Sequence, residues 1–216
     1  MIPSARLIAI TTPYRADDLG IKEPLDLVEF AGRWDYGTKS IEKMGDRGVI
    51  ERWLAAGEES MVEMIDATVF ITCSRVVSHE LVRHRLASYQ QESQRFVAYE
   101  DESLEDLFYV PDEVKGHLAT NMVVREAFYH AQKAYKLLRL NRVPKQIARY
   151  ILPNGTRTRI IIKANAREWR HILRLRLHKS AQPEMRQIMS LILPQLQEVY
   201  GKVLFPDDIA AERSAR

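Results

Sequence analysis

The chain has 216 residues, of which 46% are hydrophobic and 28% are charged, a net charge of +3 and one cysteine, Cys73. These values are typical of a globular protein and argue against disorder, and a lone cysteine excludes a disulfide framework and a cysteine-based metal cluster. We find no apolar run near the roughly 18 to 20 residues of a membrane span and no signal peptide, so we expect a cytoplasmic protein without a membrane partner.

The first part of the chain predicts little regular structure. Turn-forming residues over 10–24 indicate an irregular opening, and LDLVEFAG at residues 25–32 predicts a short strand. Apolar residues over 46–56 predict a helix that ends at Gly57, because glycine readily takes the left-handed conformation that closes a helix.

The middle of the chain predicts a strand, a helix, a loop and a long helix, in that order. β-Branched residues over 61–73 favour a strand, and Ser74 is suited to cap the helix behind it. Residues 83–96 are mostly polar and predict a loop. Asp112 is suited to cap a long helix that reaches Leu140.

The last part of the chain predicts two further helices on either side of a strand, and a final helix. Pro144 begins the short helix KQIARYIL, and residues 156–164 predict a strand. An N-x-x-E pair starting at Asn165 is close to a capping box and opens an arginine-rich helix. Pro183 begins the final helix, and we expect the tail after about residue 206 to fray.

The order of these elements indicates the fold class. Strands and helices do not alternate regularly, which disfavours a doubly wound βαβ fold, and no internal repeat is present. We therefore predict an α+β protein in which helices pack on a mostly antiparallel sheet, with residues 1–216 forming a single domain.

Positive charge is concentrated in residues 142–186, which contain nine arginines and three lysines against two acids. Arginine presents a planar fork of donors that matches phosphate and carboxylate. The stretch therefore predicts an anionic partner, which a nucleotide, a dinucleotide cofactor, nucleic acid or an acidic protein would satisfy. A solvated basic face is the alternative, and it is the commoner role of a charge run.

A second basic cluster lies in RHRLASYQQESQRF, residues 83–96. Arg83, His84 and Arg85 are adjacent cations that repel one another unless anionic groups neutralise them, and Ser93 beside Arg95 offers a second anion site. A basic helix end stabilised by the helix macrodipole is the structural alternative, and for an isolated R-H-R motif it is the better interpretation.

These residues resemble the signature of the flavin-dependent thymidylate synthases, in which R-H-R is followed by seven residues and a serine. Four other blocks are similar to the family and appear in the expected order. They are GEESMVE at residues 57–63, VPKQIARYILP at 143–153, NAREWRHILRLR at 165–176 and AQPEMR at 181–186. The resemblance covers roughly residues 57 to 200, so it is more than a local motif match.

The chain departs from the family pattern at several positions. Glu58 stands where the family has a histidine, Asp35 where a small residue is common, and Glu80 where glutamine is frequent. After the NAREWRHILRLR block the family often has aspartate and then histidine, where this chain has His178 and Ser180.

The resemblance implies a role for each matching side chain. The residues that it implies for dUMP binding are Glu80, Arg83, Gln91, Ser93, Gln94, Arg95, Arg149 and Arg176. Those that it implies for FAD binding are Ser60, Arg83, His84, Arg85, Gln91, Asn165, Arg167 and His171. Arg176 is also the expected catalytic residue, because a fixed positive charge at the uracil edge stabilises negative charge that develops on the ring. No metal is implied.

The reaction implied by the resemblance is the reductive methylation of dUMP to dTMP. Methylenetetrahydrofolate would donate the carbon and NADPH would reduce FAD, in a homotetramer whose subunits share each active site. Cys73 lies in an apolar, β-branched run, so we expect a buried, inert thiol and no thiolate mechanism. Ser93 could also be a nucleophile, but no adjacent base is evident in the sequence, and we assign it to binding.

Three alternatives stay open at the level of sequence. An arginine-rich nucleic-acid-binding protein is disfavoured by the small net charge and the lack of a recognised motif, so we expect no nucleic-acid partner. An inactive descendant of the enzyme is the second alternative, and a flavoenzyme acting on another pyrimidine nucleotide is the third.

Overall fold

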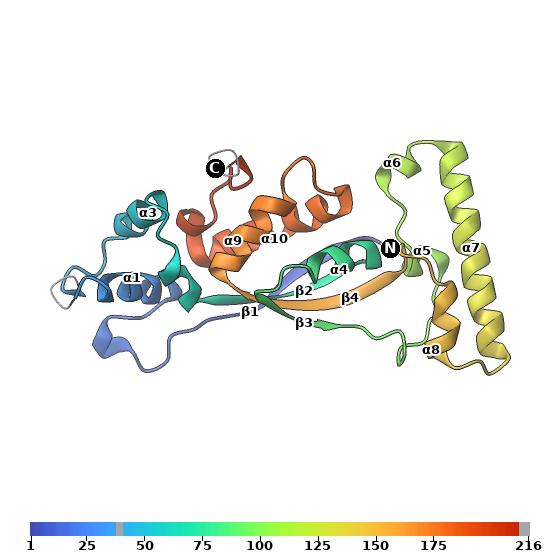
Figure 1. Cartoon of the computed structure of the whole chain (residues 1–216), viewed down its shortest axis with the longest axis horizontal. Helices are drawn as coiled ribbons and strands as arrows, with labels where there is room; N and C mark the ends of the chain where they lie inside the picture. Colours follow the sequence, from blue (N-terminus) through green and yellow to red (C-terminus); the bar gives the residue numbers. More distant parts are fainter. Residues whose placement is uncertain (38–40, 212–216) are drawn as a thin grey trace.

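A computed structural model describes residues 1–37 and 41–211 of the chain (Figure 1). In this part of the chain, four antiparallel strands form a sheet with the order β1-β2-β4-β3. The strands are β1 (Ser4–Ile10), β2 (Asp66–Ser74), β3 (Ala87–Gln91) and β4 (Arg157–Asn165). The predicted α+β class, with helices on a mostly antiparallel sheet, is confirmed.

The two central strands, β2 and β4, bury one face of the sheet. Successive side chains of a strand point to opposite faces, so alternate residues share a side. On β2 the buried set is Ala67, Val69, Ile71 and Cys73, and on β4 it includes Ile160, Ile162 and Ala164. Val69 lies opposite Ile162 and Ile71 opposite Ile160, which places both sets on the same face.

Helices α9 (Ala166–Arg176) and α10 (Pro183–Leu204) cover this buried face (Figure 1). The fully buried Trp169 of α9 donates from Nε1 to the carbonyl oxygen of Ala67 at 3.0 Å. The Tyr200 hydroxyl of α10 donates to the carbonyl oxygen of Asp66 at 2.5 Å. Both helices are therefore fixed to β2 by polar contacts within an apolar core.

Strand β1 was not predicted, because its residues alternate only weakly between half-buried and exposed positions. It is held to α10 by the side chain of Gln195. Leu7 N donates to Gln195 Oε1 at 2.7 Å, and Gln195 Nε2 donates to the carbonyl oxygen of Ala5 at 3.2 Å.

Residues 25–32 lie within helix α1 (Pro24–Trp34), so the predicted strand is wrong. Glu23 and Asp26 form a capping box, and proline at the first helical position favours helix initiation. Within the helix, the buried Glu29 accepts a hydrogen bond from Arg33 Nε, four residues later, at 2.7 Å. The four-residue spacing of a helix therefore explains how the buried Glu29 finds a charged partner. A half-buried strand would not place these two residues side by side.

The neighbouring elements agree more closely with expectation. Helix α3 (Gly48–Ala55) confirms the helix predicted over 46–56, and Gly57 behind it has a φ of +82°. The strand predicted from residue 61 begins only at Asp66, because the 3-10 helix η2 (Ser60–Met64) precedes it. A further 3-10 helix, η1 (Asp17–Leu19), lies in the irregular opening.

Ser74 caps α4 (Arg75–Leu81) as predicted, since its Oγ accepts from Val77 N at 3.4 Å. The loop predicted over residues 83–96 is only partly correct, because β3 occupies its centre and pairs with β4. Polar residues conceal this strand from a sequence pattern, as is common for strands at a sheet edge.

The segment 104–151 forms a helical group at the far end of the sheet (Figure 1), which we call the distal helices. Its elements are α5 (Leu104–Leu107), α6 (Asp112–Lys115), α7 (Leu118–Leu140), α8 (Lys145–Ala148) and η3 (Arg149–Ile151). The single long helix predicted from residue 112 is interrupted, because His117 is extended, and Pro111 rather than Asp112 is the N-cap of α6. The helix predicted from Pro144 divides into α8 and η3.

The final helix begins at Pro183, as predicted, and continues to Leu204. Ile209, in the tail that we expected to fray, is fully buried, while residues 212–216 lie outside the described part of the chain. Across residues 1–37 and 41–211, we find no helix that combines the length and the apolar character needed to cross a membrane.

Candidate active site

The turn after α4 and the C-terminal end of α9 meet at Arg176. Its Nε donates to His84 Nε2 at 3.0 Å, its Nη1 to Glu80 Oε2 at 2.7 Å and its Nη2 to the carbonyl oxygen of Glu80 at 3.2 Å. The R-H-R motif and the late arginine-rich helix, which are far apart in the sequence, are therefore brought together in space.

Buried polar contacts fix the turn that carries the R-H-R motif. The Tyr89 hydroxyl donates to the carbonyl oxygens of Leu81 and His84, at 2.6 and 2.9 Å, and burial raises its pKa to about 12. At the start of α4, Ser74 donates from N and Oγ to the buried carboxylate of Glu184, at 2.7 and 2.5 Å. Both ends of α4 are thus anchored before the turn begins.

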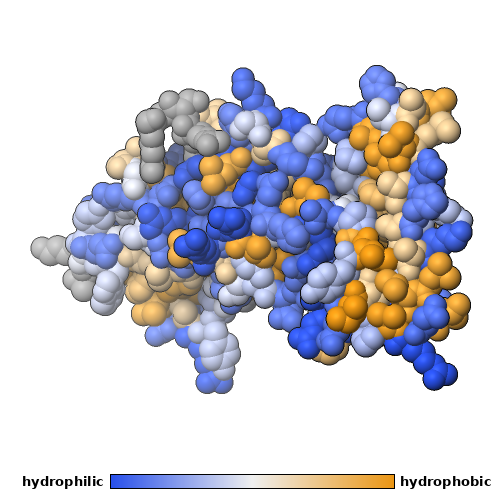
Figure 2. All heavy atoms as spheres, turned by 45° about the vertical axis from the view of Figure 1, so that its right-hand side comes forward, coloured by the Kyte–Doolittle hydropathy of each residue, from blue (hydrophilic) through white to orange (hydrophobic). Residues whose placement is uncertain are grey.

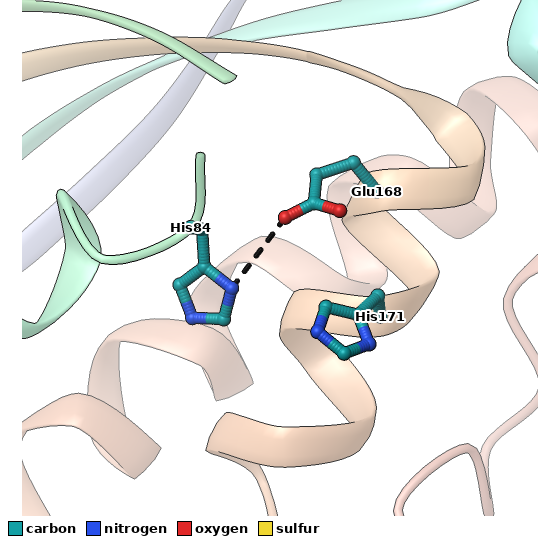
Figure 3. Close-up of side chains that lie close together, drawn as sticks. All are labelled: His84, Glu168 and His171. Carbon is teal, nitrogen blue, oxygen red and sulfur yellow. Dashed lines mark ion pairs between the residues drawn. The ribbon is translucent and has the colours of Figure 1, made fainter. Parts of the chain in front are cut away.

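His84 is a neutral imidazole at neutral pH. Its burial, together with the nearby charges of Arg176 and His171, lowers its pKa to about 4. The Nδ1 atom lies 3.5 Å from Glu168 Oε1, and the ring stands edge-on to that of His171 with a centroid separation of 5.8 Å (Figure 3). Burial also raises the pKa of Glu168.

A cleft of 1310 Å³ lies beside this cluster, between α3, η2 and α9. It is larger than most small-molecule pockets, which occupy about 300–1,000 Å³, so it can accept a ligand of dinucleotide size. Three residues that the sequence assigned to FAD line it: Asn165, Arg167 and His171.

Acidic residues hold the arginines along one side of this cleft. Glu59 Oε1 accepts from Arg174 Nη2 at 2.7 Å and lies 3.4 Å from Arg170 Nη2. Burial opposes ionisation of Glu59, but these guanidinium groups outweigh it and hold the pKa below its usual value. Arg167 pairs with Glu63 at 2.5 Å. The cleft wall therefore has fixed, preorganised charges rather than freely moving ones.

Most of the remaining residues assigned to FAD are exposed. Arg83 and Arg85 have no ion pair within residues 1–37 and 41–211, so both guanidinium groups can bind an anion. Ser60 begins η2 next to the cleft-lining Glu59 and is also exposed. Gln91 is tied down instead, since its Nε2 donates to Ser78 Oγ at 2.9 Å and to Thr158 Oγ1 at 3.1 Å.

Another group of predicted dUMP residues lies past the opposite end of β3. Ser93 Oγ accepts from Arg95 N at 3.3 Å, and Lys145 Nζ of α8 donates to the carbonyl oxygen of Phe96 at 2.7 Å, which ties this loop to the helix that precedes Arg149. Gln94 is buried, and its Nε2 has no hydrogen-bond partner among the described residues. No hydrogen bond or ion pair between described residues connects this group to Arg176.

Two acidic residues of the site were missed by the sequence reasoning. Glu59 lies in the GEESMVE block, where only Ser60 received a role, and Glu168 was considered only as a helix-capping residue. The predicted cap of this helix by Asn165 is confirmed, because Asn165 Oδ1 accepts from Glu168 N at 2.8 Å. The surplus of arginines near both glutamates could have indicated them, because buried cations need acidic partners.

The chain belongs to the flavin-dependent thymidylate synthase family. A family model described as thymidylate synthase complementing protein matches residues 19–201. The flavin-dependent thymidylate synthase of Pyrococcus abyssi is 34% identical over 183 residues, which cover 81% of this chain and 75% of the relative. That of Corynebacterium aurimucosum is 36% identical over 208 residues, covering 88% and 82% of the two chains.

Solved structures share the same fold. The UMP/dUMP methylase PolB from Streptomyces cacaoi, bound with 5-Br dUMP, has a TM-score of 0.77 and 20% identity over 92% of this chain and 91% of its own. Thymidylate synthase X from Helicobacter pylori, with FAD and dUMP, has a TM-score of 0.76 and 22% identity over 97% and 99% of the two chains.

Proposed function

We propose that this chain catalyses the reductive methylation of dUMP to dTMP as a flavin-dependent thymidylate synthase. The observation that carries the proposal is the convergence of Arg176 with the R-H-R turn beside a cleft of dinucleotide size. Family membership selects this chemistry among the ligands that an arginine-rich cleft could bind.

The donor set of the cleft suits FAD, whose diphosphate needs cationic and amide partners. Arg83 and Arg85 have no ion pair among the described residues and lie on the turn just before the cleft-lining Leu86. Arg167 and His171 line the cleft from α9, and Asn165 lines it from the residue that caps this helix. Guanidinium groups bind diphosphate oxygens through charge-assisted hydrogen bonds. When bound and reduced, FAD supplies the hydride that the reaction needs.

The role of Arg176 is to stabilise negative charge on the uracil ring of dUMP. The guanidinium is half-buried and is held at three points by His84 and Glu80, so it is preorganised before substrate binds. A fixed charge of this kind acts where charge develops in the transition state and costs no reorganisation. Ser93, Arg95 and Arg149 bind the nucleotide, and the unpartnered amide of Gln94 is a donor that a substrate carbonyl would satisfy.

The carbon donor is methylenetetrahydrofolate and the reductant is NADPH. A thiolate nucleophile is unavailable, because the only cysteine, Cys73, is fully buried and burial raises the pKa of its thiol. Glu58 stands where the family has a histidine, and its Oε2 accepts from the Tyr36 hydroxyl at 3.0 Å.

The functional form is a cytoplasmic homotetramer in which subunits share each active site. Helix α7 presents an exposed apolar face at the far end of the molecule (Figure 2). We call this the α7 face, and its residues are Leu118, Met122, Val123, Tyr129, Leu137 and Leu140. Exposed apolar patches of this kind mark association sites. Association would also supply, from a second chain, the dUMP residues that lie past the opposite end of β3.

A flavin spectrum and a tritium-release assay test the proposal. The purified protein should absorb between 350 and 500 nm as a flavoprotein, a range set by the flavin chromophore. It should release tritium from C5-labelled dUMP only when NADPH and methylenetetrahydrofolate are both present. A protein that binds flavin but releases no tritium would contradict the activity. A flavin-free protein that binds nucleic acid with a steep salt dependence would favour the arginine-rich alternative.

A further inference from the structure

We propose that Glu168 is a positioning residue for Arg176, and that it acts by fixing the tautomer of the His84 imidazole that lies between them. Figure 3 shows His84 on the turn after α4 and Glu168 and His171 on α9, with Glu168 directed at the His84 ring. The tautomer can be read from the contacts alone, and its consequence for turnover rests on the proposed function of Arg176.

The contact with Arg176 determines where the proton of His84 lies. A guanidinium Nε always carries a hydrogen, so at 3.0 Å from His84 Nε2 it can only donate, and Nε2 must be unprotonated. The ring is neutral at neutral pH, because its pKa is lowered to about 4 by burial, Arg176 and His171. A neutral imidazole carries one proton, which therefore lies on Nδ1.

Glu168 offers a carboxyl oxygen close to this proton and so favours this tautomer. Its Oε1 lies 3.5 Å from His84 Nδ1, and the two side chains are only 6% and 5% exposed, so water has little access to the pair. The backbone of Glu168 is fixed in the first turn of α9 by the cap from Asn165. Burial raises the pKa of Glu168, but both its ionised and its protonated form keep an oxygen that accepts a hydrogen bond.

The orientation of Arg176 depends on that tautomer. Moving the proton from Nδ1 to Nε2 would set an N–H of His84 against the Nε–H of Arg176, which removes an acceptor and adds repulsion. The guanidinium would then keep only its contacts with Glu80 and could turn about them. Glu168 thus acts on Arg176 through His84, in the way that a carboxylate selects the tautomer of a histidine in other sites.

A metal ion at the same three residues is the competing interpretation. The candidate ligand atoms of His84, Glu168 and His171 lie within 4.8 Å of one another. However, a metal on Nδ1 of His84 would displace the proton to Nε2, where Arg176 already donates. The observed contact and a metal on Nδ1 are therefore mutually exclusive, and the geometry favours the proton.

Nitrogen NMR of the flavin-loaded enzyme, labelled with 15N-histidine, tests the tautomer without any turnover. His84 is assigned by its absence in His84→Gln. We expect the proton on Nδ1 in the wild type and in Glu168→Gln, which keeps an acceptor oxygen, and a measurable shift to Nε2 in Glu168→Ala. A wild-type proton on Nε2, or an unchanged tautomer in Glu168→Ala, would overturn the proposal even if the enzyme is fully active.

Steady-state kinetics test the consequence for Arg176. We expect Glu168→Ala to lower kcat per bound flavin by up to about 10²-fold, because a small misplacement of a catalytic group can cost that much, with little change in KM for dUMP. Glu168→Gln should recover most of the loss. Equal losses in both variants would contradict the acceptor role, as would a loss in Glu168→Ala that reflects only lost flavin.

A variant of a surface glutamate and a titration with zinc are the controls for these two experiments. Glu198→Ala removes an exposed carboxylate on α10 and should leave kcat and the His84 signal unchanged. Zinc added to the wild type should leave the Nδ1 proton in place. Stoichiometric zinc binding that abolishes this signal and requires Glu168 would show that the cluster is a metal site and would overturn the proposal.

Discussion

The sheet end of the molecule and the distal helices differ in how completely they bury their apolar residues. The large core joins β2 and β4 to α9 and α10, and it supports His84 and Arg176 through continuous packing. The distal helices share a small core around Tyr99, Leu107 and Tyr135, and α7 leaves a broad apolar face exposed. The comparison indicates that the sheet end positions His84 and Arg176 through its own core, whereas the distal end leaves an apolar surface open to association, as the proposed homotetramer requires.

The largest effect should come from Arg176→Ala, at the sheet end. We expect turnover to fall by about 10²–10³-fold, the usual cost of removing one preorganised donor from a developing charge. Flavin should stay bound, because Arg167 and His171, the residues of α9 assigned to FAD, lie one or more helical turns from Arg176. Tritium release per bound flavin is the measurement. Arg6→Ala, an exposed arginine on β1, is the matched control, and equal rates in all three proteins would refute the assigned role.

At the distal end, a charge on the α7 face should dissociate the assembly. Leu137 and Leu140 are 50% and 79% exposed, so Leu137→Asp with Leu140→Asp should fold normally but bury unpaired carboxylates at an interface. Sedimentation velocity should show smaller species, and activity should fall with them. Lys43→Asp, at an exposed position outside the distal helices, is the control for charge alone. An unchanged sedimentation coefficient would exclude this face from the interface.

The core at the sheet end should be far more sensitive to truncation than the α7 face. Trp169 is fully buried against β2, so Trp169→Ala should lower the free energy of unfolding by about 3–5 kcal/mol. Chemical denaturation of the flavin-free protein measures it. In the Leu137→Asp and Leu140→Asp background, in which the α7 face is expected to be free, Leu118→Ala at a residue that is 77% exposed should change the value by less than about 0.5 kcal/mol. Similar losses in both variants would mean that the two ends are packed alike.

His84 should contribute to the free energy of unfolding by a smaller amount than Trp169, and this contribution should depend on pH. Its pKa is lowered to about 4 in the folded state, against an ordinary value of 6.5. Between these values the unfolded chain binds a proton that the folded chain does not, so stability rises with pH from about 4 to 6.5 and is then constant. Denaturation of wild type and His84→Gln across this range should differ in slope only below pH 6.5. Parallel curves would contradict a buried, neutral His84.

The strands of the sheet show what the sequence could and could not predict. β2 and β4 are central strands whose β-branched residues alternate or run apolar, and both were predicted. The bounds of β4 were nearly correct, whereas β2 was predicted to begin at residue 61 and begins at Asp66. β1 and β3 lie at the edges and have mixed polar patterns, so neither was recognised. The run LDLVEFAG was misread because an apolar stretch of this length fits either a strand or a buried helix face.

The candidate site shows the same limit. The motif blocks predicted that Arg176 and the R-H-R turn lie together, and the contact between Arg176 Nε and His84 Nε2 agrees with this prediction. The contact between Glu168 and His84 could not be predicted, since it depends on how the turn after α4 is seated against the first turns of α9. No local pattern indicated, either, that the residues assigned to dUMP are divided between the two ends of β3.

Mixing two inactive variants tests most directly whether two chains build one site. Arg176→Ala disables the sheet end and Arg149→Ala the distal end, so each should be inactive alone. When the two are co-expressed and mixed oligomers are isolated with different affinity tags, some sites receive an intact Arg176 from one chain and an intact Arg149 from another. The account predicts that tritium release returns in the mixed oligomers. Mixed oligomers that stay inactive would show that both arginines must come from the same chain.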